Sequence, residues 1–109
     1  MSNVIPLFKD QGKKQRPSLQ KLDAFRKGLE EGGIVMISLD TMQAGVALPS
    51  RLMGLECVSL NYSHRYNLPD FGYDEAGVSA TLSFDEGFFY CMVPWTSVFR
   101  VGDCVWQEK

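Results

Sequence analysis

The sequence is poor in the residues from which most catalytic and metal sites are built. Its 109 residues include one histidine and three cysteines. The cysteines, Cys57, Cys91 and Cys104, are odd in number, lie far apart and lack C-x-x-C spacing, which argues against a closed disulfide framework and against a structural zinc site. We expect Cys57 and Cys91 to be small buried side chains within strands and Cys104 to be an exposed thiol.

Long apolar runs are also missing. No run approaches the roughly 20 residues that a membrane-spanning helix needs, and the N-terminus lacks the apolar core of a signal peptide. Apolar residues nevertheless make up 45% of the chain and charged residues 22%, as is typical of a globular protein. We therefore predict a single cytoplasmic domain that does not contact a membrane.

Catalytic motifs are absent as well. His64 stands in the segment Ser63–Arg65, just after a predicted strand, and the sequence shows no partner that would make it a general base. The adjacent carboxylates Asp74-Glu75 and Asp85-Glu86 point to opposite sides of an extended chain, so neither pair suits acid–base catalysis. Glycine-rich phosphate loops and the G-x-S-x-G motif are missing. The sequence thus predicts a non-enzymatic protein without a metal or another cofactor.

Charge is small in sum but uneven along the chain. The net charge is −2. Residues 1–17 carry four basic residues against Asp10 and are predicted to form a flexible basic arm, whereas residues 32–109 carry nine acids against four basic residues. Such an acidic body repels a phosphate backbone, which counts against nucleic-acid binding. Within the arm, the apolar stretch Val4–Lys9 is either a plain tail, a strand that caps the body or a short docking peptide.

One helix is predicted, over residues 18–31. Ser18 follows Pro17 and suits an N-cap, and Gly32-Gly33 suits a left-handed C-terminus. Between them, four apolar residues at helical spacing form a single stripe. The stripe consists of Leu19, Leu22, Phe25 and Leu29. A single short helix must bury such a stripe either on its own sheet or on a partner's helix.

After residue 33 the pattern changes to short strands separated by turns. The clearest feature is a hairpin in which Val78–Phe84 and Phe88–Val93 flank the turn Asp85-Glu86-Gly87, and Pro94 ends the second strand. The other predicted strands are Ile34–Leu39, the edge strand Ala44–Pro49, Leu55–Tyr62 with Val58, Leu60 and Tyr62 on one face, one short edge strand within Tyr66–Gly77, and Val98–Val101. One helix followed by roughly five to seven strands predicts an α+β, mainly β fold with a small, strongly bent open barrel.

The order of these segments resembles that of the stringent starvation protein B (SspB) family, the adaptors of the ClpXP protease. The motifs that carry the resemblance are Gly45–Pro49, Val58–Asn61, Val78–Phe84 and Val93–Phe99. They lie within residues 18–101, which the resemblance assigns to an SspB-like domain with a short tail over 102–109. It implies a helix followed by an Sm-like open barrel and a homodimer formed through the four stripe residues. It also implies a groove that holds ssrA-like degradation tags for delivery to the unfoldase ClpX.

By resemblance, this peptide groove lies beside Leu60–Arg65 and Val78–Phe84. An extended peptide would add main-chain hydrogen bonds to the strands, while pockets bind selected side chains. The implied apolar contacts are Leu60, Tyr62, Leu82 and Phe84. The implied polar contacts are Asn61, His64, Arg65, Thr81 and Ser83, with Arg65 available for an acidic residue of the tag.

Other interpretations stay open at this point. SspB adaptors continue into a long tail that docks onto the unfoldase, whereas only eight residues follow Val101, too few for a flexible linker of that reach. The arm segment Val4–Lys9 is the candidate replacement for the missing tail. The alternatives to a peptide-binding adaptor are an Sm-like RNA-binding module, which the acidic body disfavours, and an assembly protein that does not bind tags.

Overall fold

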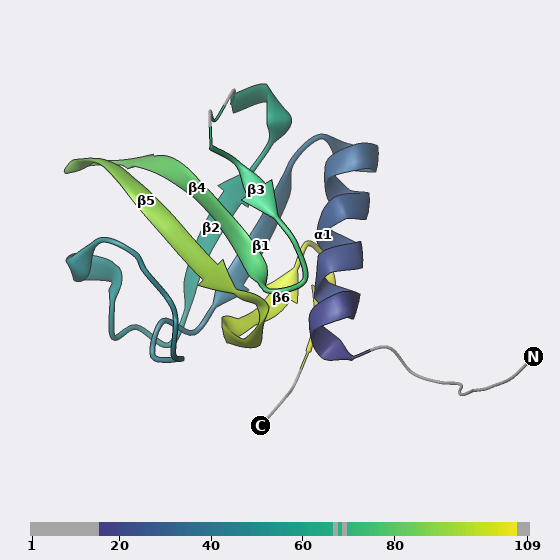
Figure 1. The fold of residues 1–109 in the computed structure, drawn as a ribbon, viewed down its shortest axis with the longest axis horizontal. Helices are drawn as coiled ribbons and strands as arrows, with labels where there is room; N and C mark the ends of the chain where they lie inside the picture. Colours follow the sequence, from purple (N-terminus) through teal and green to yellow (C-terminus); the bar gives the residue numbers. More distant parts are fainter. Residues whose placement is uncertain (1–15, 67, 69, 107–109) are drawn as a thin grey trace, which may run out of the picture.

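The computed structural model describes residues 16–66, 68 and 70–106. Over these residues one helix is followed by short antiparallel strands, and Figure 1 shows the helix standing beside the sheets. The predicted α+β, mainly β class is therefore confirmed. The predicted basic arm, including Val4–Lys9, lies outside the described residues except at its last two positions.

The helix α1 spans Pro17–Gly32, one residue longer at each end than predicted. Proline suits the first helical position because the N–H that it lacks has no partner inside the helix. Arg16 rather than Ser18 is consequently the N-cap residue, and no side chain caps this end. At the other end Gly33 adopts the left-handed conformation, with φ of 79°, as predicted.

Four strands form the first sheet, in the order β2-β1-β6-β7. The central strand β1 (Val35–Leu39) pairs antiparallel with β2 (Val58–Tyr62) on one side and with β6 (Val98–Val101) on the other. These three strands confirm predicted ones, although β2 begins later than expected. The two-residue strand β7 (Cys104–Val105) was not predicted and pairs with β6.

The chain after Val101 is therefore part of the fold rather than a tail, at least as far as Trp106. The main-chain N–H of Trp106 donates to the oxygen of Phe99 at 2.8 Å. Its indole N–H donates to Oε1 of Gln20 at 2.9 Å. These two bonds tie the end of the described chain to β6 and to α1.

Three strands form the second sheet, in chain order: β3 (Gly72–Tyr73), β4 (Gly77–Phe84) and β5 (Gly87–Pro94). β4 and β5 pair along their whole length, so that Phe84 lies opposite Gly87 and the loop between them is only Asp85-Glu86. The predicted hairpin, the end of its second strand at Pro94 and the short edge strand before it are confirmed.

The two sheets are not closed into a barrel. β5 passes to β6 through a 3₁₀ turn at Trp95–Ser97, because the ring of Pro94 interrupts the ladder. The predicted edge strand Ala44–Pro49 is wrong: only Ala47 pairs, through two hydrogen bonds with Met92 of 2.9 and 3.1 Å. From there the chain runs beside β5 to the hairpin tip, where Arg51 Nε lies 2.9 Å from the Glu86 carboxylate.

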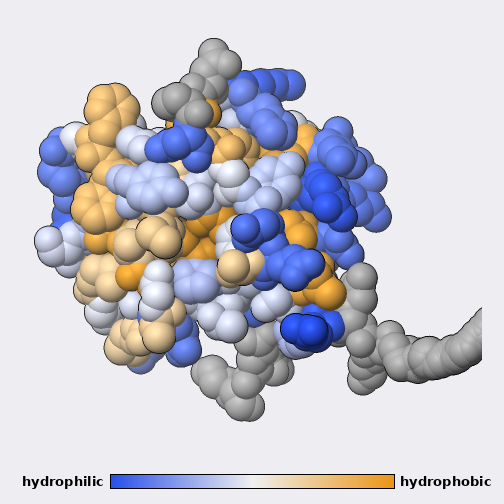
Figure 2. Space-filling model, viewed as in Figure 1, coloured by the Kyte–Doolittle hydropathy of each residue, from blue (hydrophilic) through white to orange (hydrophobic). Residues whose placement is uncertain are grey.

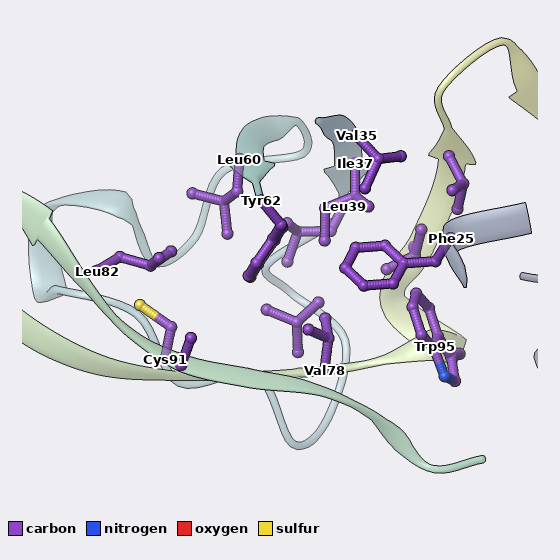
Figure 3. Close-up of a cluster of buried hydrophobic side chains, with 14 of the residues drawn as sticks. Phe25, Val35, Ile37, Leu39, Leu60, Tyr62, Val78, Leu82, Cys91 and Trp95 are labelled. Atoms are coloured by element: carbon purple, nitrogen blue, oxygen red, sulfur yellow. The ribbon is translucent and has the colours of Figure 1, made fainter. Parts of the chain in front are cut away.

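The hydrophobic core lies between α1 and the two sheets, and Phe25 contributes the helix's aromatic ring to it (Figure 3). Its ring makes edge-to-face contacts with Tyr62, Tyr73 and Trp95 at centroid distances of 5.4, 5.2 and 5.5 Å. Three stripe residues, Leu22, Phe25 and Leu29, are buried in this core, and Leu19 packs against it. The helix stripe is thus covered by the chain's own sheets, which corrects the expectation that it is left for a partner's helix.

The three cysteines differ in their surroundings. Cys91 is fully buried and Cys104 is exposed, as predicted. Cys57 is exposed, contrary to expectation, because β2 begins only at Val58 and the preceding residues do not join the sheet. Over the described part of the chain, no helix is long and apolar enough to cross a membrane.

Candidate peptide-binding groove

Among the described residues, no strand covers the outer edge of β2, which is the first strand of the sheet order β2-β1-β6-β7. The carbonyl of Met36 accepts a hydrogen bond from the turn that follows β6, so its main chain faces β6. In an antiparallel sheet the main-chain N–H and C=O groups of successive residues point alternately to the two neighbouring strands. Those of Ile37 therefore point to β2, where Ile37 pairs with Leu60. Ser59 and Asn61, on either side of Leu60, consequently turn their N–H and C=O groups away from β1.

Over its second half, the corresponding edge of β4 pairs with no strand of the described part of the chain. β3 pairs only with Val78 and Ser79. Further along, the N–H of Thr81 donates to Oδ1 of Asp70 at 2.8 Å instead of joining the β5 ladder. By the same alternation, the N–H and C=O of Ser83 point to this edge as well.

The two edges border one groove of about 410 Å³. Its apolar and aromatic walls are Leu60, Tyr66, Leu68, Leu82, Phe84 and Phe88. Its neutral polar walls are Ser59, Asn61, Thr81 and Ser83. A groove with apolar walls, neutral polar groups and strand main chain on both sides is suited to an extended peptide.

The groove opens at the end of the core that lies farthest from α1. Figure 3 shows Leu60 and Leu82 at one end of the buried cluster, with Phe25 and Trp95 at the other. Both leucines are almost fully buried, whereas Phe88 is 80% exposed. Figure 2 shows apolar surface gathered over the end of the β4–β5 hairpin, in contrast to the hydrophilic outer side of α1.

Six of the nine predicted peptide contacts line this groove. They are Leu60, Asn61, Thr81, Leu82, Ser83 and Phe84. Tyr62 does not line it, because the alternation of β2 places its ring in the core, fully buried between Phe25 and Phe71. Burial raises the pKa of the Tyr62 hydroxyl, and the predicted role of Tyr62 as a peptide contact is wrong.

His64 and Arg65 also lie outside the groove. Ser63 ends β2 by donating to the oxygen of Gly33 at 2.6 Å and accepting from the N–H of Arg65 at 3.1 Å. A 3₁₀ turn over His64–Tyr66 follows. The Arg65 guanidinium lies beside Gly33 and the His64 ring packs 5.4 Å from Phe71, so the predicted contact of Arg65 with an acidic tag residue has no place here.

Comparison with known proteins does not identify a family. No protein-family model and no curated protein matches this sequence. The resemblance to SspB remains a prediction made from the order of its segments. The function is therefore argued from the groove.

Four groove residues were not predicted: Ser59, Tyr66, Leu68 and Phe88. Ser59 was recoverable from the sequence, because it shares an edge with Asn61. Phe88 was also recoverable, since the hairpin register places it opposite Ser83. Tyr66 and Leu68 carry no sequence signal for this position, because the path of the loop between β2 and β3 brings them there.

A larger hollow, of about 560 Å³, lies where β3, β4 and β5 meet the segment Ala44-Gly45. It is lined mainly by small residues such as Gly72, Ala76 and Gly77. At this end β4 is already paired on both sides, with β3 and β5, so no uncovered edge of β4 is available there. We therefore place the candidate site in the smaller groove.

The residues that the structure describes do not form a metal-binding site. They contain no group of three histidine, cysteine, aspartate or glutamate side chains close enough to share a metal ion. Among the described residues that form its walls, the groove has no titratable acid or base other than the Tyr66 phenol, and the Asp70 carboxylate lies next to it, bonded to the wall residue Thr81. The walls of this groove are suited to binding peptide main chain and neutral side chains.

Proposed function

We propose that this chain is a non-enzymatic peptide-binding adaptor that holds an extended polypeptide segment between β2 and β4. The observation that carries the proposal is the pair of uncovered strand edges facing one apolar groove. Main-chain groups of Ser59 and Asn61 on one side and of Ser83 on the other face the space that a peptide would occupy. Peptide binding by strand addition uses such edges for affinity and side-chain pockets for specificity.

The apolar walls supply the second half of the interaction. Leu60 and Leu82 form a buried floor, and Phe84 and Phe88 rise beside it. Burying one apolar peptide side chain there contributes about 1.5–3 kcal/mol. Net main-chain hydrogen bonds add about 0.5–1.5 kcal/mol each. A short unstructured segment can therefore bind while folded surfaces, whose main chain is already paired, cannot.

The resemblance to SspB supports a cytoplasmic role in which ssrA-like tagged polypeptides are held and delivered to ClpXP. The segment Val4–Lys9 is the proposed contact with ClpX. Deleting residues 2–9 is expected to abolish binding of the adaptor to ClpX and to leave peptide binding intact. Unchanged ClpX binding after this deletion would remove the docking role.

A homodimer belongs to the same proposal but cannot use the buried stripe residues. Its interface would have to involve the outward face of α1 or another exposed surface, with only Leu19 of the stripe partly accessible. Sedimentation equilibrium of the full chain tests this, and a mass of one chain over the whole concentration range would exclude the dimer.

Fluorescence anisotropy with a labelled ssrA peptide tests the groove. Phe88→Ala removes an exposed aromatic wall and is expected to weaken binding at least fivefold, by loss of apolar contact. The matched control is Tyr90→Ala on the same outward face of β5, which does not line the groove and is expected to bind like the unchanged protein. Leu82→Asp is expected to abolish binding, with circular dichroism to confirm that this variant folds.

The same titrations separate the proposal from its alternatives. If the peptide binds saturably and neither Phe88→Ala nor Leu82→Asp changes its affinity, the groove is excluded as the binding site. No saturable binding of any peptide would favour an assembly protein. Tight, steeply salt-dependent binding of a labelled RNA oligonucleotide would favour an Sm-like RNA-binding module instead.

A further inference from the structure

Asp70 places a carboxylate at the β4 edge of the groove. Its Oδ1 accepts the N–H of Thr81 at 2.8 Å and its Oδ2 accepts the Thr81 hydroxyl at 2.6 Å. Both oxygens are thus within bonding distance of a residue that lines the groove. These bonds lower the pKa of Asp70, so the exposed side chain is ionised at neutral pH.

No basic side chain among the described groove walls balances this charge. Arg65 lies beside Gly33 at the end of α1. Arg51 is held by the Glu86 carboxylate at the hairpin tip. A peptide in the groove therefore passes a negative charge without meeting a positive one on the walls.

Asp70 also determines where a strand can pair with β4. Because it already uses the N–H of Thr81, an added strand pairs through the C=O of Thr81 and the main chain of Ser83. The peptide residue next to Thr81 then lies beside the carboxylate. An ionised carboxylate has about four acceptor positions, and Thr81 uses two, so Asp70 can still accept from a lysine or an arginine of the peptide.

We propose that Asp70 is a specificity-determining residue, and that the groove selects segments carrying a basic residue beside their apolar ones and disfavours segments with an acidic residue there. This inference rests on the proposed function, since it specifies the peptide class for the same groove. The preference is set by an exposed charge pair, so it amounts to about two- to fivefold in affinity for lysine over a neutral residue. High salt reduces it.

The test uses three sets of labelled peptides that differ only in one residue: lysine, glutamine or glutamate. Because the register is not fixed in advance, the substituted residue is moved stepwise along the peptide. Anisotropy titrations are expected to rank lysine over glutamine over glutamate at one position. At about 1 M salt, where the Debye length is about 3 Å, the three affinities are expected to converge.

Two protein variants complete the experiment. Asp70→Asn keeps an oxygen for the Thr81 N–H but removes the charge, and is expected to abolish the ranking while glutamine peptides bind as before. Asp85→Asn removes the same charge from the exposed hairpin loop and is expected to preserve the ranking. A ranking that survives Asp70→Asn, or that both variants abolish equally, would overturn the role of Asp70. Failure of all peptides to bind would instead overturn the proposed function.

Discussion

The Nζ atom of Lys21 donates a hydrogen bond of 2.9 Å to the main-chain oxygen of Trp95, which lies 74 positions later in the chain. Lys21 is only 1% exposed, and its Nζ also lies 5.8 Å from the centroid of the Trp106 ring. Trp95 begins the 3₁₀ turn that leads from β5 to β6. The Lys21 side chain thus links α1 to the turn that connects the two sheets.

Replacing Lys21 by alanine is expected to lower the free energy of unfolding by about 1.5–3 kcal/mol, because a hydrogen bond from a charged donor is lost together with the packing of the side-chain stem. The matched control is Lys27→Ala, which makes the same change at an exposed site of α1 and is expected to alter stability by less than about 0.5 kcal/mol. Urea denaturation measures both. Equal effects would show that the bond to Trp95 does not stabilise the fold.

Gly77, at the start of β4, has no room for a side chain. An added Cβ would overlap the carbonyl oxygen of Val93 and lie 2.7 Å from the Cα of Pro94. Gly77→Ala is therefore expected to lower the free energy of unfolding by about 1–3 kcal/mol through backbone displacement. Gly72→Ala is the control, since no atom lies within 4 Å of its added Cβ. A comparable loss of stability in Gly72→Ala would show that the cost comes from replacing any strand glycine and not from the close contact at Gly77.

Much of this fold was predictable because local patterns coincide with tertiary packing. The helix stripe, the alternation that buries Val58, Leu60 and Tyr62, and the hairpin around Asp85-Glu86 each follow from one segment of sequence. The features that were missed depend on distant contacts. β7 exists because Trp106 reaches Gln20 on α1, 86 positions away, and a two-residue strand has no periodicity of its own.

The groove was predictable in part, through the resemblance to SspB. That resemblance assigned Leu82, Ser83 and Asn61 to the groove, but deciding which face of each strand lines the groove and which faces the core required the structure. Tyr62 was assigned to the groove although Phe25 and Phe71 enclose it, a contact that no local pattern shows. Arg65 was misplaced because the turn after β2 depends on the hydrogen bond from Ser63 to Gly33 in another part of the chain.

The Tyr62 hydroxyl is buried and has no hydrogen-bond partner among the residues that the structure describes. Burying a hydroxyl without a partner costs about 1–3 kcal/mol. Tyr62→Phe removes this cost but also removes the packing contacts of the oxygen, so the free energy of unfolding is expected to rise by about 1 kcal/mol. Tyr66→Phe, at an exposed position, is the control and is expected to change it by less than about 0.5 kcal/mol. A clear loss of stability in Tyr62→Phe would reveal a partner for the hydroxyl.

Stability is expected to fall at alkaline pH because two buried acids stay protonated in the folded state. Burial raises the pKa of the Cys91 thiol from 9.0 to about 11 and raises that of Tyr62 above its usual 10.0. Above about pH 9 the unfolded chain releases protons that the folded chain keeps, so the free energy of unfolding decreases as pH rises from about 9 to 11. Urea denaturation of the unchanged protein and of Cys91→Ala, repeated at several pH values, tests this. If the free energy of unfolding decreases equally with pH in both proteins, Cys91 does not contribute to the pH dependence.

The burial of Cys91 also determines which thiols react. The thiolate is the nucleophilic form, and Cys91 is both inaccessible and shifted toward the protonated thiol, whereas Cys57 and Cys104 are exposed. An aromatic disulfide reagent at neutral pH is therefore expected to modify two of the three thiols rapidly and the third only as fast as the protein opens. Cys57→Ser is expected to leave one rapid thiol, and Cys91→Ala to leave both. Rapid modification of all three thiols in the native protein would contradict the burial of Cys91 on β5.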